Sequence, residues 1–127
     1  MFKKIVYFLP SIFILSVIFY LSSLSSTGIG GSLTTQFLIH KTLHLLVYSS
    51  LSISFYFAFF KTTTKTFRQI SALSILLTFL YGITDEIHQY FVPGRGAKVT
   101  DTLFDLLGAF IGIYFVRRTI RLLIQKH

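Results

Sequence analysis

The sequence predicts an all-α integral membrane protein, a four-helix transmembrane bundle with both termini in the cytoplasm. Of the 127 residues, 53% are hydrophobic and only 13% are charged, whereas soluble domains carry about 25% charged residues. A chain this short has one small core, which cannot bury so much apolar surface in water. The basic residues also stand at the ends of apolar runs. We therefore expect a single membrane domain over residues 1–127.

Four stretches are long and apolar enough to cross a bilayer, for which a helix needs about 20 residues. They are residues 5–24, 37–60, 69–91 and 101–120. Pro10 lies inside the first stretch and predicts a kink, since membrane helices tolerate proline where neighbours satisfy the freed carbonyl. The run Lys3–Lys4, the apolar stretch and Ser22–Ser26 also resemble a secretory signal peptide. The stretch is long for a signal peptide and no alanine cleavage site follows it, so we predict a retained span.

The three linkers differ in composition. Ser25–Gln36 is rich in Ser, Thr and Gly, and Lys61–Arg68 is short and basic. Val92–Thr100 contains Pro93 and two glycines, which indicate a turn.

The lysines and arginines predict the orientation, because cytoplasmic loops carry an excess of them. Nine lie before the first span, between the second and third, or at the C-terminal end: Lys3, Lys4, Lys61, Lys65, Arg68, Arg117, Arg118, Arg121 and Lys126. Only Lys41, Arg95 and Lys98 lie on the other side. Because the charges are used in this way, nucleic acid is not an expected partner.

Ionisable residues gather in the half of the chain that faces outward. All four acidic residues lie there, as do three histidines: Asp85, Glu86, Asp101, Asp105, His40, His44 and His88. At a helical rise of about 1.5 Å per residue, Asp85 and Asp105 lie roughly 25 and 18 Å above the cytoplasmic boundary. Such depth is costly unless the residue faces a bundle interior or a wet cavity.

Helical spacing places these residues on one face of each helix. Lys41, His44 and Tyr48 share a stripe, Asp85, His88 and Gln89 share a second, and Asp101 and Asp105 a third. We predict that the faces meet in a polar pocket that opens outward.

Several simpler interpretations stay open. Lys41 and His40 could snorkel to the interface, and Tyr48 could only pack. An ion-pair network of the acids with Lys41 and Arg95 is the strongest structural alternative. Gly108 and Gly112 have the spacing that lets membrane helices pack closely.

No metal site is predicted, although His40 and His44 at i and i+4 are a zinc-like pair. The chain has no HExxH motif and no cysteine. The carboxylates come from other helices, so ligation would require assembly in three dimensions. Whether the protein uses a cofactor is left open by the sequence.

The chain resembles the VanZ-like family in an ordered motif over the last three predicted helices. The motif is Lys41-x-x-His44-x-x-x-Tyr48, then Asp85-Glu86-Ile87-His88-Gln89-x-Phe91-Val92-Pro93-Gly94-Arg95, then Asp101 and Gly108. The resemblance implies a multi-pass protein of the bacterial cytoplasmic membrane, in a family named after a teicoplanin-resistance factor. Two positions depart from the family, which often has Asn at Asp105 and a small residue at Lys98.

Two hypotheses about function follow. In the first, an enzyme acts on an envelope lipid or a lipid-linked glycan, and His44 or His88 transfers a proton, since histidine titrates near neutrality. Asp85 or Glu86 would orient that histidine or act as base. The predicted substrate-binding residues are Lys41, Tyr48, Gln89, Arg95, Asp101 and Asp105.

In the second hypothesis the same residues form a non-catalytic site for a lipid headgroup, a lipoglycopeptide or another envelope protein. A small proton-coupled carrier is a third possibility, because intramembrane acids serve proton relays. The expected partners are membrane lipids and a lipid-linked envelope precursor.

Overall fold

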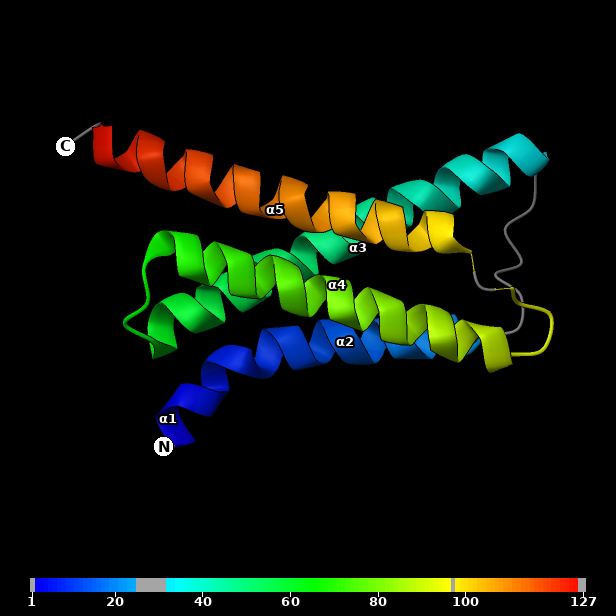
Figure 1. The fold of residues 1–127 in the computed structure, drawn as a ribbon, viewed down its shortest axis with the longest axis horizontal. Coiled ribbons are helices and arrows are strands. Elements are labelled where there is room, and N and C mark those ends of the chain that lie inside the picture. The colour runs from blue at the N-terminus through cyan, green and yellow to red at the C-terminus, as the bar shows by residue number, and fades with distance from the viewer. Residues whose placement is uncertain (1, 25–31, 97, 126–127) are drawn as a thin grey trace.

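The computed structural model describes residues 2–24, 32–96 and 98–125, and every regular element in these ranges is helical. Residues 25–31 of the predicted Ser25–Gln36 linker, and Lys126, lie outside the described residues. The elements in chain order are α1 (Phe2–Ile5), η1 (Val6–Phe8), α2 (Leu9–Ser22), α3 (Leu33–Thr62), α4 (Phe67–Phe91) and α5 (Val99–Gln125) (Figure 1).

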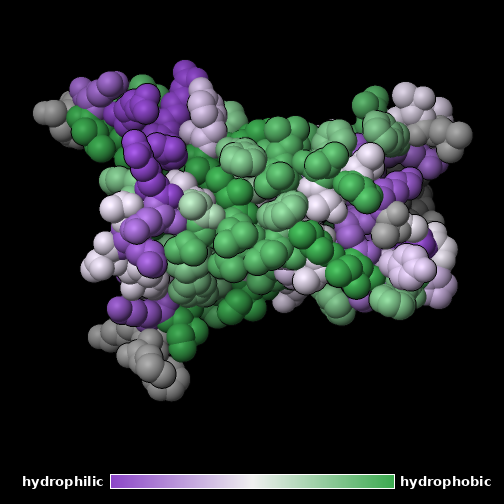
Figure 2. Space-filling model, in the orientation of Figure 1, coloured by the Kyte–Doolittle hydropathy of each residue, from purple (hydrophilic) through white to green (hydrophobic). Residues whose placement is uncertain are grey.

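Three of the helices, α3, α4 and α5, are long and apolar enough to span a membrane. The apolar segment Val6–Ser22 is shorter. Its length is roughly 25 Å, against a hydrocarbon core of about 30 Å. The surface agrees with a membrane setting, because an apolar band separates two polar ends (Figure 2).

The long helices extend past the predicted spans because their ends are capped. The Ser32 hydroxyl accepts a hydrogen bond from the Thr35 N–H at 3.2 Å, so α3 begins before residue 37. Thr66 and Gln69 form a capping box, which starts α4 two residues before the predicted span. Helix α5 continues beyond residue 120 into its basic end.

The kink predicted at Pro10 is confirmed. Proline has no N–H to donate to the Val6 carbonyl, and the Leu9 N–H donates to that carbonyl instead. The tighter bond makes η1 a 3₁₀ turn, and α1 leaves the axis of α2 there (Figure 1).

Helices α3 and α5 touch through their main chains. A Cβ at Gly108 would lie 2.8 Å from the Leu45 carbonyl oxygen, and one at Gly112 would lie 2.5 Å from that of Ser49. The Ser49 hydroxyl donates to the Gly108 carbonyl at 2.7 Å. The packing role predicted for the two glycines is therefore confirmed, and we call this contact the glycine seam.

Helix α2 packs against the other helices through both apolar and polar contacts. Ile18 joins the buried cluster of Tyr48, Leu51 and Phe55 from α3. The Tyr81 hydroxyl of α4 donates to the Leu15 carbonyl of α2 at 2.7 Å. These contacts fix α2 beside α3 and α4.

Seven of the nine basic residues predicted to share a side lie, among the described side chains, at one end of the bundle. Helix α1, the end of α5 and the α3–α4 loop are together there (Figure 1), and the Lys4 ammonium donates to the Thr62 carbonyl at 3.3 Å. We call this the basic end, comprising Lys4, Lys61, Lys65, Arg68, Arg117, Arg118 and Arg121. The start of α3 and the α4–α5 loop lie at the opposite end.

Candidate functional site

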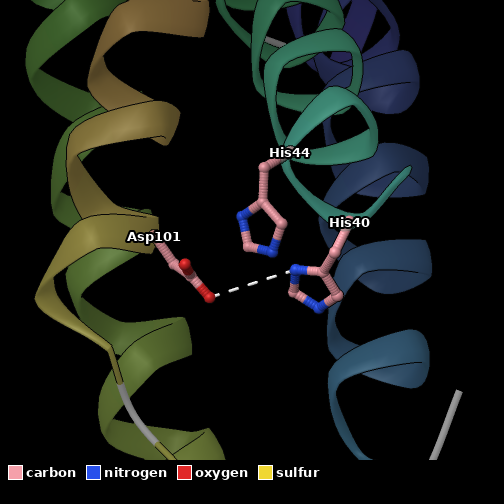
Figure 3. A group of neighbouring side chains, drawn as sticks. All are labelled: His40, His44 and Asp101. Atoms are coloured by element: carbon pink, nitrogen blue, oxygen red, sulfur yellow. Dashed lines mark ion pairs between the residues drawn. The ribbon is translucent and has the colours of Figure 1, made fainter. Parts of the chain in front are cut away.

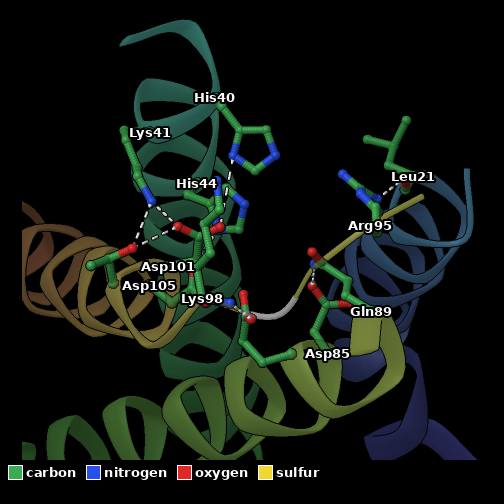
Figure 4. Close-up of polar contacts among 12 residues, drawn as sticks. Leu21, His40, Lys41, His44, Asp85, Gln89, Arg95, Lys98, Asp101 and Asp105 are labelled. Carbon is green, nitrogen blue, oxygen red and sulfur yellow. Dashed lines mark hydrogen bonds and ion pairs between the residues drawn. The ribbon is translucent and has the colours of Figure 1, made fainter. Parts of the chain in front are cut away.

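The structure brings most of the predicted site residues into one layer at the end opposite the basic end (Figure 4). We call this the polar layer. Seven of its members are buried: Lys41, Tyr48, Asp85, Glu86, Gln89, Asp101 and Asp105. His44 is the eighth member, and its side chain is 11% exposed. The layer therefore joins α3, α4 and α5, the three helices whose polar faces the sequence predicted to meet.

Lys41 and Asp101 form the ion pair that links α3 to the start of α5. Both are almost fully buried, at 5% and 4% exposed, and the Lys41 ammonium also donates to the Thr100 hydroxyl at 3.3 Å. Snorkelling of Lys41 to the membrane interface is therefore wrong for this fold. The ion-pair alternative also changes, because Lys41 pairs with Asp101 and not with the acids of α4.

His44 and Asp105 make a second link between α3 and α5. His44 Nδ1 lies 2.6 Å from Asp105 Oδ1, and the His44 ring stacks on Tyr48 at a centroid distance of 5.9 Å. Gly82 of α4 allows this approach, because a Cβ there would lie 3.0 Å from Asp105 Oδ2. That oxygen has no hydrogen-bond partner among the described residues.

The two acids of α4 have different tasks. Asp85 Oδ2 accepts from the Gln89 amide at 2.7 Å and from the Tyr48 hydroxyl at 3.4 Å. Glu86 Oε2 accepts from the Lys98 backbone N–H at 2.7 Å. Glu86 thus secures the α4–α5 loop, and the contact that the structure gives Lys98 is through its main chain, with its side chain exposed.

His88 and Arg95 face α2 and connect it to the site. His88 Nε2 lies 3.0 Å from the Ser23 hydroxyl, and its ring lies 4.6 Å from that of Phe19. Arg95 donates to the Leu21 carbonyl at 2.7 Å (Figure 4). Sequence reasoning missed α2 as part of the site, because a backbone carbonyl carries no sequence signal.

A cavity of about 240 Å³ opens between α2 and the polar layer. Its apolar lining is Ile18, Leu21, Leu24, Leu43 and Val47, and its polar lining is Ser22, His40, His44, Tyr48, Asp85, Gln89 and Arg95. The polar lining contains five of the predicted site residues. It also contains His40, which was not predicted as a site residue. The cavity is therefore amphipathic.

The charge of this region is close to balanced. The region contains four carboxyl groups and three cationic side chains, Lys41, Arg95 and Lys98, so one negative charge is in excess when the carboxyl groups are ionised and the histidines are neutral. Carboxylate oxygens of Asp85, Glu86 and Asp105 stay unpartnered among the described residues. Of these three residues, Asp85 lines the cavity. A buried unpartnered polar atom is rare in native proteins and calls for a specific explanation, such as a bound ion, a water molecule or a catalytic role.

A helical bundle with three membrane-length helices and a buried layer of ionisable residues defines a small polytopic membrane protein with a polar site. The family model VanZ/LLP1 matches residues 1–123. The chain belongs to the VanZ/LLP1 family, as its motif led us to expect. Neither a curated protein nor a solved structure matches it.

Proposed function

We propose that the protein binds the anionic headgroup of an envelope lipid or lipid-linked glycan from the outer leaflet. The observation that carries the proposal is the amphipathic cavity, with an apolar wall from α2 and α3 opposite histidines and Arg95. A lipid has the same division, with an acyl or prenyl chain joined to a charged headgroup.

Arg95 is the best placed phosphate partner. Its Nη1 donates to the Leu21 carbonyl, which holds the guanidinium at the cavity wall. A guanidinium has five N–H donors, so others remain for a phosphate oxygen. Gln89 and His40 line the same cavity and add further polar groups.

The orientation belongs to the same proposal: four crossings, with the basic end in the cytoplasm and the cavity outside. The excess of Lys and Arg at the basic end supports it. The segment Val6–Ser22 is shorter than the hydrocarbon core is thick. It would cross the membrane where the bilayer thins locally around it, as it does around other short spans. A C-terminal green fluorescent protein should fluoresce and a C-terminal alkaline phosphatase should be inactive; the reverse pattern would refute it.

An enzyme and a binder both fit the site. The His44–Asp105 pair favours an enzyme, because a carboxylate that orients a histidine is a common general-base arrangement. A binder would use the same residues without turnover. Incubation of the purified protein with a polyprenyl phosphate or pyrophosphate, followed by mass analysis of the lipid, separates the two.

The binding proposal is tested by native mass spectrometry of the purified protein with a polyprenyl phosphate. Arg95→Gln should weaken retention by about tenfold or more, since a hydrogen bond to a charged group contributes about 1.5–3 kcal/mol. Lys98→Gln is the matched control. It removes a cation from the same loop, and the Lys98 side chain is exposed. Equal retention by wild type and Arg95→Gln would overturn the proposal.

A role in resistance follows from the family name and has its own test. Expression in a sensitive Gram-positive host should lower susceptibility to teicoplanin. Asp85→Asn, His88→Ala and Arg95→Lys should lose protection at membrane levels matched by immunoblot. Full protection by all three variants would mean that Asp85, His88 and Arg95 have only a structural role.

A further inference from the structure

His40 converges on one point with His44 and Asp101, two members of the polar layer. One ligand atom from each lies within 4.8 Å of the others, and Figure 3 shows both rings and the carboxylate turned toward one another. His40 and His44 are one turn apart on α3, and Asp101 arrives from the start of α5. The fold therefore supplies the carboxylate that the sequence left on another helix.

The His44 ring is oriented as metal-binding imidazoles are. With Asp105 ionised, His44 donates its Nδ1–H to Asp105 Oδ1 at 2.6 Å, which leaves Nε2 with a free lone pair. A carboxylate on the second nitrogen fixes the tautomer and raises the basicity of such a ligand. The hydrogen bond between His44 and Asp105 is a separate observation from the convergence of His40, His44 and Asp101.

Asp101 divides its two oxygens in a similar way. Oδ1 pairs with Lys41, while Oδ2 faces His40 Nδ1 at 4.0 Å. The excess negative charge of the region also favours a cation. A divalent ion would change the balance from one negative to one positive charge.

We propose that His40, His44 and Asp101 bind one divalent transition metal ion of the zinc class. Two imidazoles and one carboxylate suit zinc, whereas magnesium and calcium prefer oxygen alone. Tetrahedral bonds of about 2.0–2.1 Å place donor atoms about 3.3 Å apart, so donor atoms that now lie within 4.8 Å of one another would approach by up to about 1.5 Å on binding. The His40 side chain is 29% exposed, which gives its ring room to turn.

The fourth coordination position faces the cavity, because His40 and His44 both line it. Three protein ligands with one open position are typical of metal sites that act on a substrate, and not of structural sites. The metal site does not depend on lipid binding. Where a phosphate also binds, the ion would hold one of its oxygens opposite Arg95.

Titration of the chelator-treated, detergent-purified protein with Co²⁺ and Zn²⁺ tests the site. Wild type should bind one ion per chain with the intense visible absorption of four-coordinate Co²⁺. His40→Ala and His44→Ala should weaken binding by at least tenfold, and Asp105→Asn by about tenfold to a hundredfold through its effect on His44. His88→Ala, which removes the histidine that contacts Ser23 and Phe19, should bind as wild type does.

His40→Ala is the decisive variant, because a partly exposed side chain can be removed without unfolding the bundle. Size-exclusion profiles matched to wild type establish that the variants are folded. Wild type that binds no ion, or His40→Ala and His44→Ala that bind as wild type does, would overturn the proposal. Lipid retention is measured on metal-free protein, so failure of the metal site and failure of lipid binding are distinguishable.

Discussion

The two ends of the bundle carry their charges in opposite ways. In the polar layer, Lys41 is buried and pairs with Asp101 from another helix. At the basic end, Arg117, Arg118 and Arg121 are exposed on α5 and line a separate cavity of about 570 Å³. An exposed charge keeps its hydration and needs no partner, whereas a buried one requires a partner from the fold. The contrast is what the proposed function expects, with a basic end that orients the chain and a polar layer that forms the binding site.

The largest expected effect is at the buried pair. Lys41→Met leaves Asp101 without its partner and should lower the free energy of unfolding by about 3–5 kcal/mol. Denaturation in mixed micelles measures it. Lys98→Met is the control and should change stability by less than about 0.5 kcal/mol. Lys41→Met combined with Asp101→Asn should regain most of the loss, and stability unchanged in Lys41→Met alone would show that the pair does not matter.

A smaller effect is expected at Asp105. Asp105→Leu leaves His44 without its acceptor and should cost about 1–3 kcal/mol of unfolding free energy. Asp105→Asn keeps an acceptor oxygen and should cost less than Asp105→Leu by the same denaturation measurement. If Asp105→Asn lowers the unfolding free energy as much as Asp105→Leu does, the negative charge of Asp105 is needed. The site would then differ from that of family members with Asn at this position.

At the basic end we expect a change in lipid association and not in stability. Each arginine near an anionic membrane surface contributes about 1 kcal/mol of attraction. Replacement of Arg117, Arg118 and Arg121 by Gln should reduce the phosphatidylglycerol that co-purifies, counted by native mass spectrometry. The unfolding free energy should stay within about 0.5 kcal/mol per substitution. A large loss of stability would mean that these arginines are structural.

The smallest effect separates the two ends by salt. Raising salt from about 0.1 M to 1 M shortens the Debye length from about 10 Å to 3 Å. The basic end should lose phosphatidylglycerol, while the unfolding midpoint stays constant because Lys41 and Asp101 are shielded from ions. A midpoint that falls with salt would show that the polar layer is open to solvent.

Much of the fold was predictable because apolar length and charge placement are local properties. The predicted helices were too short at their ends, although Thr66-x-x-Gln69 is a recognisable capping box. The 3₁₀ turn η1 follows from Pro10, which the sequence had marked as a kink.

The site was predictable to the level of helix faces, since residues at i, i+3 and i+4 share one face. Which residue pairs with which was not, because the glycine seam sets how α3 and α5 align. In that alignment Lys41 pairs with Asp101, and His44 pairs with Asp105. The apolar wall of the cavity was missed as well, since Ile18 and Leu21 look like any lipid-facing residues of α2.

The glycine seam also separates the shape of the site from its chemistry. Because α3 and α5 meet main chain to main chain at Gly108 and Gly112, the distance between their backbones does not depend on the side chains that face the cavity. The residues at positions 44 and 105 can therefore each be replaced by another residue type while the two helices keep their spacing. Such a frame can be re-equipped for a different headgroup or ion by single substitutions, which makes the bundle a scaffold for designed membrane sites.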